Sequence, residues 1–261
     1  MSLRASDITV RLARRKILRG VSMTARPGQM TAIIGPNGSG KTTFLRALTA
    51  ELSPDAGRIT LNGTDIAGMA PDLLALRRAV LPQQSALAFP FTAAEIVRIG
   101  LSALPMPQAS ADALIAAALA RVGLTGHGGR LYQELSGGQQ QRVHLARALV
   151  QVWHPVGPEG PRWLILDEPV SSLDIAHQLA VMRLAADYAR RGGGVVAVMH
   201  DLNLTAMFAD HVLLMQNGAT LAEGPPEAVL TDTLLSCAYD CPLRTRCAPA
   251  HGAWLLPQGA A

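Results

Sequence analysis

Residues 30–43, MTAIIGPNGSGKTT, decide the fold of this chain. The first part, residues 30–34, is apolar and mostly β-branched, which predicts a buried strand. The glycine-rich residues 35–38 predict a turn, and a helical pattern then runs from about Gly40 to Leu52. A strand, a glycine-rich turn and a helix in this order are typical of α/β proteins that bind phosphate groups at the start of the helix.

The turn matches GxxxxGK[ST], the P-loop pattern, over residues 35–42. Its glycines let backbone N–H groups face phosphate oxygens, and the positive end of the helix strengthens the attraction. Lys41 can reach the β- and γ-phosphates of a nucleotide, and Thr42 can ligate Mg²⁺. An ordinary loop is the alternative, but the flanking strand and helix favour a nucleotide site. We expect the nucleotide to be bound by Gly35, Pro36, Asn37, Gly38, Ser39, Gly40, Lys41, Thr42 and Thr43.

Length and composition indicate a globular protein. With 49% hydrophobic and 16% charged residues, the 261-residue chain can bury a substantial core, in one large domain or two small ones. The net charge of +4 is too small to indicate a nucleic-acid partner, and we expect none. The longest strongly apolar run, residues 113–120, is too short to span a bilayer, and residues 1–16 lack the apolar core of a secretory signal. We therefore expect a cytosolic chain, in which Cys237, Cys241 and Cys247 are reduced thiols.

Further patterns extend the α/β start. Residues 58–61 alternate like a strand and end at Asn62-Gly63, a hairpin signal, which predicts an antiparallel flap. Residues 85–150 read as an all-helical insertion, with a helix that begins after Thr92, and the proline- and glycine-rich residues 155–161 predict a surface loop. The α/β core resumes with strands at about residues 163–166, 195–199 and 212–215, a helix at about residues 174–190 and another helix after residue 201.

Two carboxylates follow one of these strands. Residues 163–166 are apolar, and Asp167 and Glu168 come next, at the edge of the sheet where α/β proteins bind ligands. Asp167 can hold Mg²⁺ through water, and Glu168 can polarise a water molecule that attacks the γ-phosphate. Acidic residues after a strand are more often helix caps, so the pair by itself is weak evidence. The presence of the P-loop favours the catalytic interpretation.

A second phosphate-binding helix start is predicted at Ser136. Ser136 and Gln139 have the spacing of a capping box, and Gly137 and Gly138 would let a phosphate approach closely. The simpler alternative is a well-capped helix and nothing more. Because this segment lies nearly a hundred residues beyond the P-loop, inside the helical insertion, we do not expect one chain to close both around one nucleotide. The spacing therefore suggests that two chains act together.

Taken together, these motifs resemble those of the ATP-binding subunits of ABC transporters. The resemblance covers about residues 3–235 and comprises six segments in a fixed order: the P-loop, a glutamine loop at Leu81-Pro82-Gln83, the signature Leu135-Ser136-Gly137-Gly138-Gln139, the pair Asp167-Glu168, a D-loop at Ser172-Leu173-Asp174, and His200. It implies an α/β P-loop NTPase core at residues 1–84 and 151–235, with an antiparallel β flap. It also implies an inserted all-helical subdomain at residues 85–150 and a tail at residues 236–261.

The resemblance implies a role for each of these positions. Two subunits dimerise head to tail and enclose two ATP molecules, each between the P-loop of one chain and the signature (Ser136, Gly137, Gly138, Gln139) of the other. Asp174 would couple the two sites, or only cap the helix that follows it. Gln83 would contact Mg²⁺ or the attacking water, and His200 would donate to the γ-phosphate, although a histidine after a strand is more often structural. The implied catalytic residues are Glu168, His200, Gln83 and Lys41, and the implied metal ligands are Thr42, Gln83 and Asp167.

The sequence departs from the family at the site for the base. Family members usually offer an aromatic ring near the first strand for adenine to stack on, but residues 7–18 contain none. Leu12 or the aliphatic part of an arginine would have to contact the base.

The cargo is implied by local likeness only. Residues 87–91, 153–163 and 200–204 are similar to haemin import ATPases, and importers of ferric siderophores and cobalamin share most of these features. The likeness implies a homodimer at the cytoplasmic face of the inner membrane, with two copies of an integral membrane permease and, indirectly, a periplasmic haem-binding protein. Phe89 and Phe91 would line a groove for the permease, or simply pack within the insertion. A soluble ABC ATPase acting on DNA or the ribosome and a P-loop kinase are the alternatives from other classes.

Overall fold

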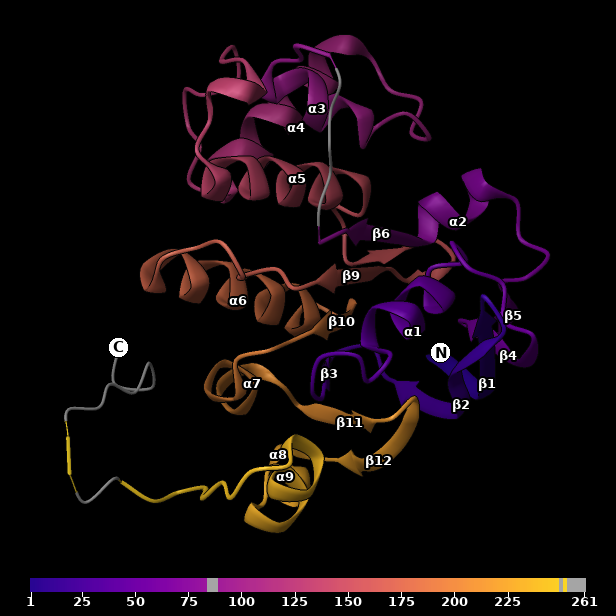
Figure 1. The fold of residues 1–261 in the computed structure, drawn as a ribbon. Helices are drawn as coiled ribbons and strands as arrows, with labels where there is room; N and C mark the ends of the chain where they lie inside the picture. Colours follow the sequence, from indigo (N-terminus) through magenta and orange to yellow (C-terminus); the bar gives the residue numbers. More distant parts are fainter. Residues whose placement is uncertain (84–88, 249–250, 253–261) are drawn as a thin grey trace.

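A six-stranded sheet forms the centre of the molecule (Figure 1). The computed structural model describes residues 1–83, 89–248 and 251–252. The strand order is β12-β11-β3-β10-β9-β6, and all neighbours are parallel except the edge pair β11 and β12. The strands are β3 (Met30–Ile34), β6 (Arg78–Leu81), β9 (Trp163–Asp167), β10 (Gly194–Val198), β11 (His211–Gln216) and β12 (Ala219–Gly224). The predicted α/β class and the predicted strands are confirmed.

The P-loop segment folds as the sequence predicts, with a shorter helix. Strand β3 is fully buried, and helix α1 (Lys41–Leu48) begins directly after Gly40. The prediction carried the helix to about Leu52, but it ends at Leu48, and Ala50 adopts a left-handed conformation with φ of 58°. This φ is incompatible with a continuing right-handed helix.

A second, antiparallel sheet contains the predicted flap. Its order is β2-β1-β4-β5, formed by β1 (Leu3–Leu12), β2 (Arg15–Ala25), β4 (Ala56–Leu61) and β5 (Thr64–Asp65). Asn62 and Gly63 join β4 to β5 with φ values of 52° and 88°. Two successive positive φ values are what a tight hairpin needs, which is why this dipeptide identified the turn from sequence.

The helical segment between β6 and β9 has the two capping boxes that the sequence indicates. Thr92 caps α3 (Ala93–Ile99) together with Glu95, and Ser136 caps α5 (Gly137–Gln151) together with Gln139. Helix α4 (Gln108–Arg121) starts directly after Pro107. Pro107 precedes the first helical residue, where its fixed φ suits the start of a helix. A single turn of 3₁₀ helix, η1 (Tyr132–Glu134), precedes α5.

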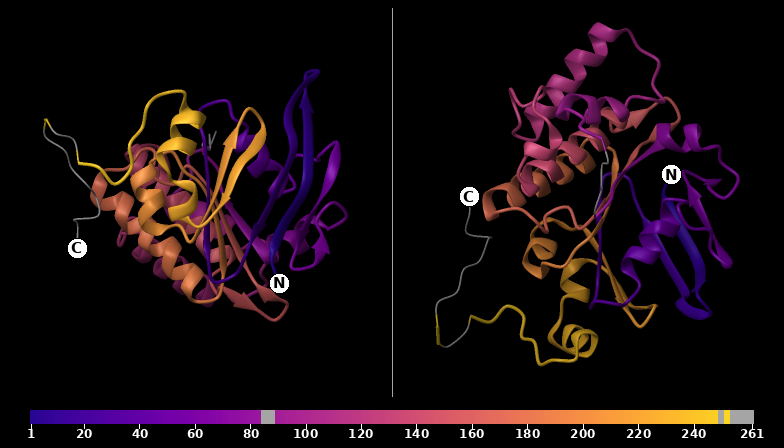
Figure 2. Two further views of the ribbon diagram at one scale, coloured as in Figure 1. Left: turned by 90° about the horizontal axis from the view of Figure 1, so that it is seen from below. Right: turned by 45° about the horizontal axis from the view of Figure 1, so that its top comes forward.

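The predicted surface loop at residues 155–161 contains a small hairpin instead. Strands β7 (Val156–Gly157) and β8 (Gly160–Pro161) pair in antiparallel register, because Gly160, at φ of 106°, allows a tight reversal. The remaining helices are α2 (Pro71–Arg77), α6 (Ile175–Arg190), α7 (Leu202–Phe208), α8 (Pro226–Val229) and α9 (Asp232–Tyr239). In Figure 2, α8 and α9 lie beside the β11–β12 pair. In the described part of the chain, none of the helices combines the length and apolar character needed to cross a bilayer.

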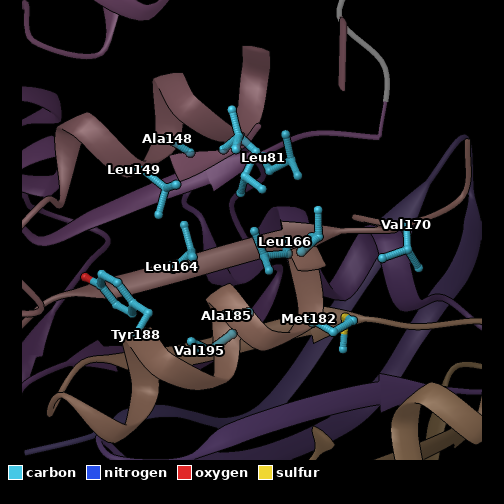
Figure 3. Close-up of a cluster of buried hydrophobic side chains, with 14 of the residues drawn as sticks. Leu81, Ala148, Leu149, Leu164, Leu166, Val170, Met182, Ala185, Tyr188 and Val195 are labelled. Atoms are coloured by element: carbon cyan, nitrogen blue, oxygen red, sulfur yellow. The ribbon is translucent and has the colours of Figure 1, made fainter. Parts of the chain in front are cut away.

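Two hydrophobic clusters cover the two faces of the central sheet. In the five parallel strands β3, β6, β9, β10 and β11, alternate hydrophobic residues belong to alternate clusters, as the period of two in a strand requires. Leu164 and Leu166 of β9 lie between side chains of α5 and α6 (Figure 3), whereas Trp163 and Ile165 belong to the cluster that contains the buried side chains of α1. Helices α1 and α5 therefore pack on opposite faces of the same sheet.

Candidate functional site

The sequence motifs meet at one edge of the central sheet. Strands β3, β10 and β9 are neighbours, and Val198 is in register with both Ile33 and Asp167. The three strands are parallel, so their carboxyl ends share an edge, where α/β proteins bind ligands. The P-loop follows β3, Asp167 ends β9 with Glu168 next to it, and His200 lies two residues beyond β10.

The P-loop is shaped by backbone that approaches too closely for side chains. Gly35 has φ of 145°, and a Cβ at this position would lie 2.1 Å from the carbonyl oxygen of Met215. Gly40 has φ of 97°, and its Cβ would lie 2.9 Å from a methyl group of Leu18. Larger residues at either position would push the loop away from its neighbours. Asn37, Gly38 and Thr42 are exposed, Pro36 and Thr43 are half-buried, and Ser39 is buried.

Lys41 lies inside the concave side of this loop. Its ammonium donates hydrogen bonds to the carbonyl oxygens of Gly35 (2.8 Å) and Pro36 (3.0 Å), and the residue is only 5% exposed. Burial lowers the pKa of Lys41, while the negative charges of Glu168 and Asp167 act in the opposite direction. A buried cation held by two neutral carbonyl groups would gain strongly from an anionic partner such as a phosphate.

Asp167 is a buried carboxylate whose hydrogen bonding is incomplete. It is 4% exposed, and among the described residues its Oδ1 has no hydrogen-bond partner. Burial raises the pKa of Asp167 to about 6, and the negative charge of Glu168 contributes to the same shift. Hard cations such as Mg²⁺ prefer carboxylate oxygens. The unpaired oxygen beside the P-loop therefore fits a magnesium ligand.

Glu168 and His200 are paired at the same edge. The Oε1 atom of Glu168 lies 2.6 Å from Nε2 of His200. Glu168 adopts φ of 51°, which is unfavourable for a residue with a side chain, and its N–H donates to the carbonyl of Val198 at 3.2 Å. Gln141 donates to the carbonyl oxygen of Glu168 at 3.1 Å. The neighbouring strand and helix α5 thus hold Glu168 in a strained conformation, as is common at functional sites.

Gln141 and the strain at Glu168 were not found from the sequence. Gln141 lies in a run of three glutamines, and only the packing of α5 over the end of β9 selects it as the partner of Glu168.

Gln83 lies at the same edge, just beyond the end of the neighbouring strand β6. Strand β6 pairs in parallel with β9, with Leu81 opposite Leu166, so Gln83 comes two residues after the end of β6. The residue is exposed. Within residues 1–83 and 89–248, no hydrogen bond joins its side chain to Asp167 or Glu168.

The signature and D-loop segments contact each other. Ser136 Oγ accepts from the N–H of Gln139 (3.3 Å), and the side chain of Gln139 accepts from the N–H of Ser136 (3.0 Å). A Cβ on Gly138 would lie 3.1 Å from Leu173 and 3.3 Å from the carbonyl of Ser172. Gly138 therefore faces the D-loop closely, while Ser136 and Gly137 are exposed.

Asp174 caps helix α6, as the simpler of its two interpretations states. Its Oδ1 accepts from the N–H of His177 at 2.9 Å and lies 2.7 Å from Nδ1 of the same residue. These hydrogen bonds lower the pKa of Asp174. The carboxylate is exposed at the surface, so capping leaves it accessible to a second molecule.

One chain does not join the signature to its own P-loop. In the described parts of the chain, no hydrogen bond connects residues 135–139 with residues 35–43. The helices that follow the two segments, α5 and α1, pack on opposite faces of the sheet (Figure 1).

The turn between β1 and β2 is the region in which the sequence predicts contacts to the base of a nucleotide. Gly40 lies against Leu18 and close to the carbonyl of Ile17, so the start of β2 borders the P-loop. Leu12, at the end of β1, is 39% exposed, and the arginines around this turn are exposed.

Comparisons with known proteins identify the family of this chain. The family model described as "ABC transporter" matches residues 18–171. The hemin import ATP-binding protein HmuV of Rhizobium meliloti (strain 1021) is 57% identical over 259 residues, covering 99% of each chain. The protein of the same name from Jannaschia sp. (strain CCS1) is 59% identical and covers 98% of this chain and 94% of its own. A solved ATP-binding cassette of an ABC transporter in its ADP conformation has a TM-score of 0.78 at 27% identity, covering 92% of this chain and 99% of that one. The chain therefore belongs to the ABC transporter family.

Proposed function

We propose that this chain is the ATP-binding and ATP-hydrolysing subunit of an importer that takes up haemin. The observation that carries the ATPase assignment is the meeting of Lys41, Asp167, Glu168 and His200 at one sheet edge. The cargo is inferred from the two relatives named for hemin import, which match this chain over nearly its whole length.

Each residue of the sheet edge has a role in this proposal. The P-loop, residues 35–43, binds the phosphates of ATP through backbone N–H groups, and Lys41 exchanges its two carbonyl partners for β- and γ-phosphate oxygens. Thr42, Gln83 and Asp167 would hold Mg²⁺. When bound, the ion would neutralise charge on the phosphates.

Glu168 acts as the general base. It accepts a proton from the water that attacks the γ-phosphorus, and the bond to the leaving oxygen of ADP breaks. Its carboxylate is paired with Nε2 of His200 at 2.6 Å. Release of this contact frees Glu168 for water and lets His200 donate to the γ-phosphate.

The active form is a head-to-tail homodimer. Because α1 and α5 pack on opposite faces of the sheet, the free helix start at Ser136, Gly137, Gly138 and Gln139 serves the P-loop of a second copy. Asp174, exposed beside the signature, couples the two sites. We also propose that the chain divides into an α/β core at residues 1–84 and 151–235, a helical subdomain at 85–150 and a tail at 236–261, whose first four residues complete helix α9 against the core.

The dimer works at the cytoplasmic face of the inner membrane with two copies of an integral membrane permease, and a periplasmic haem-binding protein supplies the cargo. Phe89 is 68% exposed and its ring lies edge-on to that of Phe91 at 6.2 Å, whereas Phe91 is half-buried and packs against the hydrophobic core. The exposed ring of Phe89 suits docking of a permease helix. Residues 87 and 88 of the stretch 87–91 lie outside the described residues.

Reconstitution tests the proposal. The chain is coexpressed with its permease, placed in vesicles, and assayed for ATP-dependent uptake of haemin, a ferric siderophore and cobalamin in parallel. We expect ATP hydrolysis with uptake of haemin alone. Uptake of one of the other two cargoes would correct the substrate, whereas hydrolysis without uptake of any of the three cargoes would overturn the assignment as their importer.

A further inference from the structure

Tyr132 lies between two segments of the helical region that the proposed function uses: the segment with Phe89 and Phe91, and the signature at residues 135–139. Its N–H donates to the carbonyl of Phe91 at 2.8 Å, and an antiparallel bridge joins Thr92 to Leu131 next to it. Ala93 extends this pairing by donating to the carbonyl of Arg130 at 2.9 Å. The backbone at Tyr132 is thus fixed to the segment that carries Phe91 and the exposed Phe89.

From this anchor, Tyr132 makes two contacts with the signature helix. Its carbonyl oxygen accepts from the side chain of Gln140 at 3.0 Å and from the N–H of Leu135 at 3.1 Å. Its hydroxyl lies 2.9 Å from Nε2 of His144, and the two rings meet edge-on at 5.3 Å. These contacts hold both the residue before Ser136 and the second turn of α5.

The pair with His144 is buried, so its geometry is narrowly constrained. Tyr132 is 8% exposed and His144 is 5% exposed. Burial and the charge of Arg147 lower the pKa of His144 to about 4, and burial raises the pKa of Tyr132. Both groups are therefore neutral at pH 7, and the bond between them is insensitive to pH in the physiological range. Removal of one partner would leave the other buried without its hydrogen bond.

We propose that Tyr132 is a positioning residue that, through His144 and Gln140, sets the place and direction of the signature helix start at Ser136. It does not touch the nucleotide. The inference rests on the proposed function, because its consequence is that ATP closes two chains against each other only when Ser136 is correctly placed. Loss of the hydroxyl should then weaken dimer closure and leave the P-loop half of the site intact.

The test measures two steps separately in the full-length chain carrying Glu168→Gln. ATP binding to the single chain is followed with a fluorescent ATP analogue, and ATP-dependent dimerisation is followed by size-exclusion chromatography with light scattering. Tyr132→Phe removes only the hydroxyl. We expect the ATP concentration for half-maximal dimerisation to rise about fivefold, as for loss of one hydrogen bond, with binding to the single chain unchanged within about twofold. Equal dimerisation of parent and variant would overturn the proposal.

Two further variants separate positioning from folding stability. Tyr188→Phe is the matched control, since Tyr188 is a buried tyrosine on α6 whose hydroxyl has no hydrogen-bond partner in the described structure; its dimerisation should equal that of the parent. The double variant Tyr132→Phe/His144→Leu removes both polar ends, which can restore stability. We expect it to recover the melting temperature but not dimerisation; recovery of both would overturn the proposal. A Glu168→Gln parent that binds ATP and stays monomeric would count against the proposed function itself.

Discussion

Replacement of Asp167 by Asn should stabilise the nucleotide-free protein more at neutral pH than at acid pH. The carboxylate is buried with an unpaired oxygen, and its pKa is raised from 3.8 to about 6. Between these two values the folded protein holds more protons at this site than the unfolded chain, so the free energy of unfolding falls as pH rises. The full shift corresponds to a loss of about 3 kcal/mol once pH exceeds the folded pKa.

The magnitude of the expected effect follows from the same two pKa values. At pH 4.5 most of the folded protein is protonated at Asp167, and the free energy of unfolding is reduced by only about 1 kcal/mol of the full 3. Asn carries no charge at either pH, and the cost of burying its amide is the same at both. The stability of Asp167→Asn relative to the natural chain should therefore be about 2 kcal/mol more favourable at pH 7.5 than at pH 4.5.

The assay is urea unfolding in the presence of EDTA and without nucleotide, at both pH values. Asp174→Asn is the control: hydrogen bonds from His177 lower the pKa of Asp174 below its ordinary 3.8, so this group is ionised at both assay pH values and its replacement should give nearly the same stability difference at each. Mg²⁺-dependent ATP binding by Asp167→Asn, measured in parallel, should be lost. If the two pH values give the same stability difference for Asp167→Asn, the ionised carboxylate does not destabilise the folded protein. The physical argument for the metal site then fails.

Three further changes test the proposed roles. Glu168→Gln should abolish turnover and trap an ATP-bound dimer on size-exclusion chromatography, because the amide cannot accept a proton from water; full turnover would contradict the role of base. Lys41→Ala should weaken ATP binding about 10- to 100-fold in a fluorescence titration, since charged hydrogen bonds to phosphate are lost, and unchanged affinity would place the phosphates elsewhere. Phe89→Ala should reduce haemin uptake in vesicles while basal ATP hydrolysis persists, and unchanged uptake would remove Phe89 from the permease contact.

Local patterns predicted most of the elements because their causes are local. The strand at Met30–Ile34, the two capping boxes and the Asn62-Gly63 turn depend on side chains and backbone angles within a few residues. The predictions that differ from the structure also have local causes, which the sequence patterns did not include. The left-handed Ala50 ended α1 early, and Gly160 turned an expected loop into the β7–β8 hairpin.

Neighbours along the chain are enough to predict the residues of the candidate site: the P-loop, the pair Asp167-Glu168 and the capped start at Ser136 are each recognised from a short stretch of sequence. How these side chains are held depends on the packing of distant segments. Parallel register brought His200 to 2.6 Å from Glu168, α5 supplied Gln141 as a clamp, and burial raised the pKa of Asp167. The distance between segments far apart in the sequence, and the desolvation of a buried charge, both depend on how the helices and sheets pack together. That packing cannot be recognised as a periodic pattern in the sequence.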